Sequence, residues 1–186
     1  FVVTWHDLSG PGPGSGSIKA RLYDAVGQGL APEFLVNQAT VNTTQKPVVF
    51  AGADGSYGVI WEEVGPSYLT EFIVGQLYDS SGVANLSPLA VYTSPCEPGF
   101  DINLDVDADA AGNFVVIWQG FCPERVLLTQ QFQPDGTPLA PPHAQSAFED
   151  GSVALDVRSD GGIVQVWHEY FSGIKSLRYD TDCDGN

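Results

Sequence analysis

The chain has 186 residues, with 7 Lys and Arg against 23 Asp and Glu, which gives a formal net charge of −16. This charge excludes the cationic surface that nucleic-acid binding requires, and it disfavours contact with an anionic membrane. Hydrophobic residues make up 43% of the chain and charged residues 16%, so we expect a packed core. No apolar run reaches the length needed to span a bilayer, and we expect no membrane insertion.

Four segments that each end in a tryptophan recur along the chain: Phe1–Trp5, Tyr57–Trp61, Phe114–Trp118 and Ile163–Trp167. The last three follow an apolar run and a turn, and these turns hold Asp54-Gly55, Ala111-Gly112-Asn113 and Asp160-Gly161-Gly162. Asp-Gly between two such runs predicts a β-hairpin in which both turn residues take positive φ. A second recurring segment follows each Trp after a variable loop: Ile18–Gly27, Ile73–Gly82, Leu128–Gly136 and Ile174–Cys183.

The repeat unit therefore holds about four short strands in roughly 50–57 residues, with no segment of helical period. Four strands per unit is the repeat of a β-propeller blade. Phe114–Trp118 is apolar on both faces, as expected for a strand covered on each side by a neighbouring sheet. The sequence thus predicts an all-β fold, a β-propeller-like array of about three and a half four-stranded antiparallel blades. Tandem β-sandwich modules are the alternative.

We expect one repeat domain over residues 1–179, with repeats at approximately 1–46, 47–100, 101–151 and 152–179, followed by an acidic tail at 180–186. The first repeat begins at its second strand and the last stops after its third, which leaves strand edges without a partner. Methionine is absent, even at position 1. We therefore expect a piece of a longer chain, or a subunit that completes itself with further copies.

Repeats of large secreted bacterial surface proteins resemble this sequence at Phe1–Trp5, Arg21–Asp24, Gly27, Glu33–Asn37, Asp54-Gly55 and Asp160-Gly161. The resemblance covers nearly the whole chain and consists of structural residues. It implies a cell-surface or extracellular propeller-like array, sometimes placed beside calcium-binding modules, and it implies no activity. The third repeat departs from the pattern, with Gln133 in place of the Asp and Ala111 in place of the turn Asp.

The acidic tail carries carboxylates at alternate positions, Asp180, Asp182 and Asp184, followed by Gly185. Such spacing lets carboxylates converge on one side of a turn, as at the start of an EF-hand-type calcium loop. The tail also resembles the opening of dockerin and thrombospondin type 3 calcium repeats. A solvated acidic terminus is the alternative. A second set of aspartates at alternate positions is interpreted as a solvent-facing strand edge, and a calcium site is the less favoured interpretation. This set is Asp101, Asp105, Asp107 and Asp109.

Two of the three cysteines, Cys96 and Cys122, bracket the third hairpin at the same end of its strand pair. A disulfide between them is geometrically natural and requires an oxidising compartment. Cys183 has no evident partner within the sequence. Together with the low lysine content, these cysteines lead us to expect a secreted protein, extracellular or on the cell surface.

A polar residue follows each of the four tryptophans, and the repeat places these residues at equivalent strand ends around one mouth of the array: His6, Glu62, Gln119 and His168. We take them as the candidate surface for a small ligand or a glycan. The alternative is that each is an ordinary polar strand end that enters a loop. The tryptophans themselves are expected in the core between blades rather than as platforms for sugar stacking.

Catalytic motifs are lacking along the sequence: there is no G-x-S-x-G elbow and no Cys–His pair with a residue to orient it. The Asp box of sialidases is not matched either. We therefore expect a non-catalytic extracellular structural or adhesive repeat module, not an enzyme, with calcium as a possible stabilising cofactor. The alternatives are a glycan-binding, lectin-like propeller and a secreted glycosidase, whose paired carboxylates are defined in space rather than in sequence.

Overall fold

A computed structural model describes residues 1–9, 16–37, 42–65, 70–85, 87–93, 103–121, 125–145, 152–169 and 173–179. All regular structure in these ranges is β: they hold 14 strands in four antiparallel sheets, which confirms the all-β class. Across the same ranges, no helix is long and apolar enough to cross a membrane. The chain forms two compact units, the first made of Phe1–Ala51 and Tyr57–Pro98, the second of Gly52–Ser56 and Gly99–Asn186.

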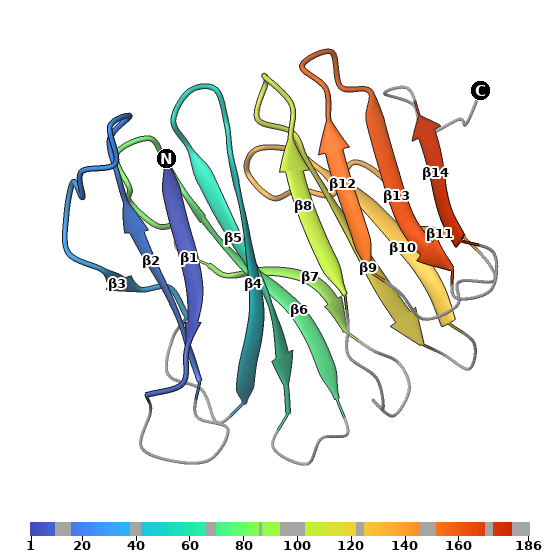
Figure 1. The fold of residues 1–186 in the computed structure, drawn as a ribbon, viewed down its shortest axis with the longest axis horizontal. Coiled ribbons are helices and arrows are strands. Elements are labelled where there is room, and N and C mark those ends of the chain that lie inside the picture. The colour runs from blue at the N-terminus through green and yellow to red at the C-terminus, as the bar shows by residue number, and fades with distance from the viewer. Residues whose placement is uncertain are drawn as a thin grey trace. The chain divides into compact units, whose positions relative to one another are not determined.

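The first unit contains two sheets, which we call sheet 1 and sheet 2 (Figure 1). The strands of sheet 1, in spatial order, are β1 (Val2–Asp7), β2 (Ser17–Leu22) and β3 (Phe34–Leu35). Those of sheet 2 are β4 (Thr43–Ala51), β5 (Tyr57–Val64), β6 (Glu71–Tyr78) and β7 (Leu89–Thr93). Every strand pairs with its neighbour in sequence, so each sheet is a simple meander.

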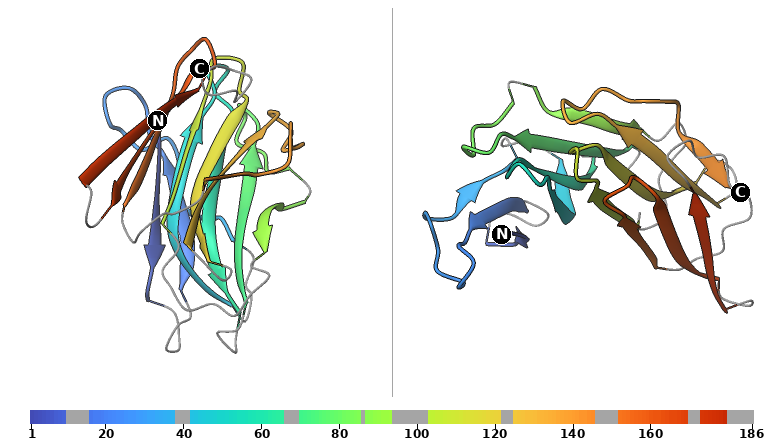
Figure 2. Two further views of the ribbon diagram at one scale, coloured as in Figure 1. Left: turned by 90° about the vertical axis from the view of Figure 1, so that its right-hand side faces the viewer. Right: turned by 90° about the horizontal axis from the view of Figure 1, so that it is seen from above.

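The second unit repeats this plan in sheet 3 and sheet 4. Sheet 3 holds β8 (Leu104–Ala108), β9 (Phe114–Phe121), β10 (Arg125–Phe132) and β11 (His143–Gln145). Sheet 4 holds β12 (Val153–Val157), β13 (Ile163–Glu169) and β14 (Gly173–Tyr179), which run side by side in orange and red in Figure 2.

Stacked aromatic rings mark the same cross-strand position in three of the sheets. The pairs are Phe1–Tyr23 at 5.3 Å, Tyr57–Tyr78 at 4.6 Å and Phe114–Phe132 at 4.9 Å between ring centroids, each within 10° of parallel. Cross-strand aromatic pairs stabilise a sheet beyond the area that they bury. Burial of the second pair also raises the pKa of Tyr78 to about 12. This shared position explains why an aromatic residue recurs four residues before a turn glycine.

The hairpin turns fall where the sequence predicts them, but their geometry differs from the expected one. In the β4–β5 turn only Gly55 takes positive φ, at 89°, whereas both turn residues were expected to. The loop is therefore a type I turn followed by one left-handed glycine. Asp54 braces it by accepting a hydrogen bond from the Ser56 N–H at 2.9 Å. The β8–β9 and β12–β13 turns likewise contain one left-handed glycine each, Gly112 and Gly161.

Within each unit, one sheet packs a defined face against a tryptophan-bearing face of the next sheet. In the first unit Ile18 and Ala20 of β2 lie against Tyr57, Val59 and Trp61 of β5. The equivalent cluster in the second unit joins Val115, Ile117 and Leu127 of sheet 3 to Val153, Leu155, Val157, Ile163 and Trp167 of sheet 4. Trp61 and Trp167 thus lie between sheets, as expected for core residues.

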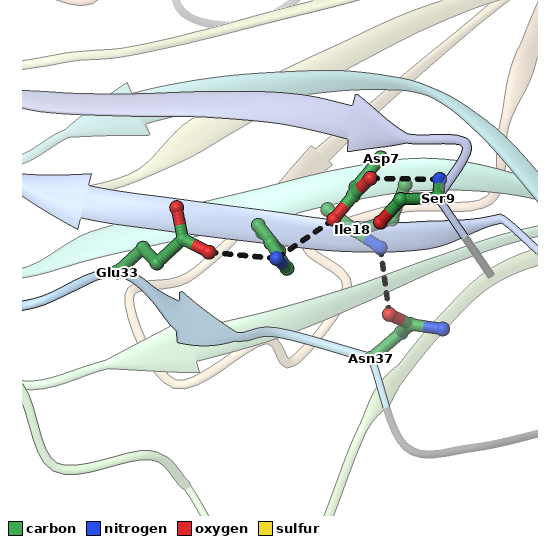
Figure 3. A network of polar contacts seen from close by, with 6 residues as sticks. Asp7, Ser9, Ile18, Glu33 and Asn37 are labelled. Carbon is green, nitrogen blue, oxygen red and sulfur yellow. Dashed lines mark hydrogen bonds and ion pairs between the residues drawn. The ribbon is translucent and has the colours of Figure 1, made fainter.

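A polar network ties the three strands of sheet 1 together (Figure 3). The Lys19 ammonium lies 2.7 Å from Asp7 Oδ2 and 2.7 Å from Glu33 Oε1. Asn37 Oδ1 accepts a hydrogen bond from the Ile18 N–H at 2.7 Å, which fastens the chain after β3 onto β2. Hydrogen bonding from Lys19, with a smaller contribution from Ser9, holds the pKa of Asp7 well below its usual value.

The left-handed glycine of the turn after β2 provides a test of backbone strain. Gly27 has a φ of 84°, and no neighbouring atom would touch an added Cβ. We expect Gly27→Ala to lower the free energy of unfolding by about 1 kcal/mol, because alanine avoids this conformation. Gly27→Asn should recover part of the loss, since asparagine tolerates it. Urea denaturation measures both variants, and equal stability of Ala and wild type would contradict the assignment.

From the ion pair between Lys19 and Asp7 we predict how part of the folding stability of the protein depends on pH. Because Asp7 titrates at lower pH folded than unfolded, its contribution is present above about pH 4 and is lost as the pH falls further. Lys19→Met removes the main cause of the lowered pKa. We expect the variant to lose less stability than wild type between about pH 5 and pH 2, as measured by urea unfolding. Parallel curves for the two proteins would count against the network.

Candidate functional site

The four polar residues that follow the tryptophans occupy the same register position in their sheets. His6 and Glu62 lie on β1 and β5 of the first unit, and Gln119 and His168 lie on β9 and β13 of the second. Each pairs with the equivalent residue of the next strand, for example His6 with Ile18 and His168 with Ile174. The repeat therefore places them equivalently, while a common ligand surface stays a prediction.

Two of these four side chains are buried, and each has a polar partner within its own unit. Glu62 is 1% exposed and lies 3.5 Å from Lys46, which has a φ of 51° at an irregularity in β4. Gln119 is 4% exposed and accepts a hydrogen bond from the Asn103 amide at 3.2 Å.

The two histidines of the set are more accessible. His6 is half-buried, and its ring fills the space beside Gly16 that a Cβ would take. His168 is exposed at the end of β13. Of the four side chains, His168 alone is exposed, because the His6 Nε2 atom is buried within the first unit.

The expected disulfide and calcium residues lie outside the described residues: Cys96, Cys122, Asp180, Asp182 and Asp184. Both sites stay predictions. Within the described ranges, no group of three or more His, Cys, Asp and Glu side chains is placed to hold a metal ion.

The alternating aspartates of β8 differ from their interpretation as a solvent-facing edge. Asp105 and Asp107 are half-buried and reach across to sheet 4. Asp105 Oδ2 accepts a hydrogen bond from the Leu155 N–H at 2.8 Å, and Asp107 Oδ2 accepts one from the Val157 N–H at 2.7 Å. Asp109 instead braces the β8–β9 turn, where it accepts the N–H groups of Ala111 and Asn113.

Each of these two carboxylates satisfies one donor on each of two strands. The second oxygen, Oδ1, accepts the N–H of the following residue, Val106 in one case and Ala108 in the other, both at 2.9 Å. Both β8 and β12 are edge strands of their sheets, so these N–H groups have no strand partner. Since unpaired buried donors are costly, the two aspartates stabilise the seam between sheet 3 and sheet 4.

The pKa of Asp105 differs from that of an ordinary surface carboxylate. Burial raises the pKa of Asp105, and the charge of Asp107 adds to the rise, while the hydrogen bonds from Leu155 and Val106 oppose it. The two residues are two positions apart on one strand, so their side chains share a face at a spacing of about 6.5–7 Å. A raised pKa with a second carboxylate nearby makes Asp105 a candidate for acid–base chemistry.

A cavity of about 170 Å³ lies at the hairpin end of the same seam. It adjoins the aspartate pair through Val157, whose N–H binds Asp107, and through Asp109, two residues further along the chain. Its lining combines apolar and polar residues: Phe114, Val115, Leu139 and Val157 with Asp109, Asn113, Gln131 and Gly161. A neutral ligand with both polar and apolar faces fits such a lining.

Comparison with solved structures finds a similar fold in an endo-arabinase from Bacteroides thetaiotaomicron VPI-5482. The TM-score is 0.52 and the identity 11%, and the match covers 89% of this chain and 65% of the endo-arabinase chain. The chain thus spans slightly less than two thirds of that enzyme, and the likeness concerns the fold. No protein-family model and no curated protein matches this sequence.

This comparison overturns the expectation of a non-catalytic structural or adhesive module, because the similar architecture belongs to an enzyme. The expectation rested on the lack of a catalytic motif along the sequence. Carboxylate pairs of glycosidases come together by folding and leave no such motif. The alternation of Asp105 and Asp107 was visible in the sequence, but the sheet that covers them was not.

Substitution of the aspartates tests the seam. In Asp107→Asn an amide NH₂ would face one of the two N–H donors, so we expect a loss of about 1–3 kcal/mol in the free energy of unfolding. Asp156 occupies the equivalent position of β12 but is exposed, and Asp156→Asn should change stability by less than about 0.5 kcal/mol. Equal effects of the two substitutions in urea unfolding would refute the role of Asp107.

Proposed function

We propose that this chain is part of a propeller-type glycoside hydrolase, in which the four sheets are successive blades. The observation that carries the proposal is the half-buried pair Asp105 and Asp107 on the edge strand β8 of sheet 3, with the pKa of Asp105 raised. The fold likeness to an endo-arabinase, a propeller-type glycosidase, supports the same class. A polysaccharide substrate also agrees with the secreted location expected from the sequence.

The two carboxyl groups take complementary roles in this proposal. Asp105, whose pKa burial raises, donates its proton to the glycosidic oxygen as the bond from that oxygen to the anomeric carbon breaks. Asp107 accepts a proton from the water molecule whose oxygen forms the new bond to that carbon.

The adjoining cavity provides a place for one sugar unit of the substrate. A sugar ring presents hydroxyl groups around its edge and C–H groups on its faces. Polar residues line the cavity together with Val115 and Leu139, whose apolar side chains suit the ring face. The cavity thereby positions a glycan along the seam that contains Asp105 and Asp107.

The test is release of reducing ends from a panel of polysaccharides that includes arabinan. We expect wild type to cleave at least one of them. Asp105→Asn should lower kcat at least about 100-fold, because general acid catalysis contributes on this scale. The alkaline limb of the pH profile reports the pKa of Asp105, and it should disappear in the variant.

The control is Asp156→Asn, an exposed carboxylate of β12 at the position equivalent to Asp107 and outside the proposed site. Its activity should equal that of wild type. Near-UV circular dichroism of Asp105→Asn separates a chemical defect from unfolding, because a purely structural role would lower activity only in proportion to the folded fraction. Lack of cleavage of every polysaccharide by folded wild type would overturn the hydrolase proposal.

A further inference from the structure

Negative charge borders the proposed site along one strand. Asp105 and Asp107 share one side of β8, and Asp109 follows two residues later, where the β8–β9 turn begins. Asp109 is the one charged residue among the described residues that line the cavity. A ligand in the cavity therefore lies beside a carboxylate, well inside the screening length of about 8 Å at physiological ionic strength.

Three of the four lysines and arginines of the second unit lie away from this cavity. Arg125 begins β10 and Lys175 lies near the start of β14, whereas the cavity adjoins the end of the seam where both strands finish. Arg178 follows Leu177, which packs toward sheet 3, so the Arg178 side chain points to the other side of β14. The fourth, Arg158, lies beside the cavity.

A carboxylate neutralises the Arg158 guanidinium. Arg158 follows the lining residue Val157 and belongs to the β12–β13 turn, which contributes Gly161 to the cavity. Its Nη2 atom lies 2.7 Å from Asp160 Oδ2. Asp160 Oδ1 accepts a hydrogen bond from the Gly162 N–H at 3.1 Å, which fixes the carboxylate within the turn. The cation nearest the cavity is therefore already paired, and it offers little net positive charge to a ligand.

We infer that Asp160 is a specificity-determining residue: by neutralising Arg158 it makes the site reject polysaccharides that carry carboxylate or sulfate groups and select uncharged ones. The inference rests on the proposed hydrolase function and names the substrate class of the same site. An anionic sugar in the cavity would lie beside the Asp109 carboxylate, and the described residues that line the cavity include no cation to pair with it. Repulsion between like charges lowers both the rate of encounter and the affinity.

Matched substrates test the choice between charged and uncharged chains. The probes are the hydroxyethyl and carboxymethyl derivatives of arabinan, or of another neutral polysaccharide that wild type cleaves, because these substituents are similar in size and differ in charge. At an ionic strength of about 0.02 M we expect kcat/KM for the carboxymethyl derivative to be at least about tenfold lower. The difference should narrow as the ionic strength rises to about 0.5 M, because salt screens the repulsion.

Asp160→Asn tests the role of Asp160. Asparagine keeps an acceptor for the Gly162 N–H but leaves Arg158 without its carboxylate. Because the ion pair is exposed, we expect a modest effect, a rise of about two- to fivefold in the ratio of kcat/KM for the carboxymethyl derivative to that for the hydroxyethyl derivative. Adding Arg158→Gln to this variant should abolish the rise. Both substrates are measured on one protein sample, so partial unfolding does not alter the ratio.

The matched control is Asp79→Asn, which removes the same charge from an exposed turn of the first unit, where Asp79 accepts the Ser81 N–H. Its ratio should equal that of wild type. Equal cleavage of the two derivatives by wild type, or an unchanged ratio in Asp160→Asn, would overturn the inference and leave the hydrolase proposal standing. Lack of cleavage of every polysaccharide would instead overturn the hydrolase proposal, and the inference with it.

Discussion

Strand β5 of sheet 2 and strand β9 of sheet 3 are buried on both faces, and the packing within each unit depends on this constraint. All eight residues of β5 are buried, and so are Phe114–Gln119 of β9. A sheet with two apolar faces is unstable alone and must be covered on both sides. Within each unit the sheets therefore stack face to face, with a tryptophan in the contact.

Face-to-face stacking does not provide hydrogen-bond partners for the edge strand of each sheet. The outward N–H groups of that strand have no strand partner. In the second unit Asp105 and Asp107 provide these partners, because each accepts one hydrogen bond from an N–H group of β8 and one from an N–H group of β12. Burial in that seam also raises the pKa of Asp105. The same physical environment thus closes the seam and prepares a carboxyl group for proton transfer, which connects the packing of the sheets to the proposed hydrolysis.

The sequence by itself determined the all-β class and the hairpin positions, because these depend on local periodicity and turn chemistry that repeat along the chain. It also showed that Asp105 and Asp107 share one side of a strand. Only the tertiary structure decided what faces them, since the N–H groups of Leu155 and Val157 lie 50 residues away. The burial of Glu62 and Gln119 and the cavity beside Val157 were decided in the same way. Each depends on how two sheets meet, and no single repeat carries that information.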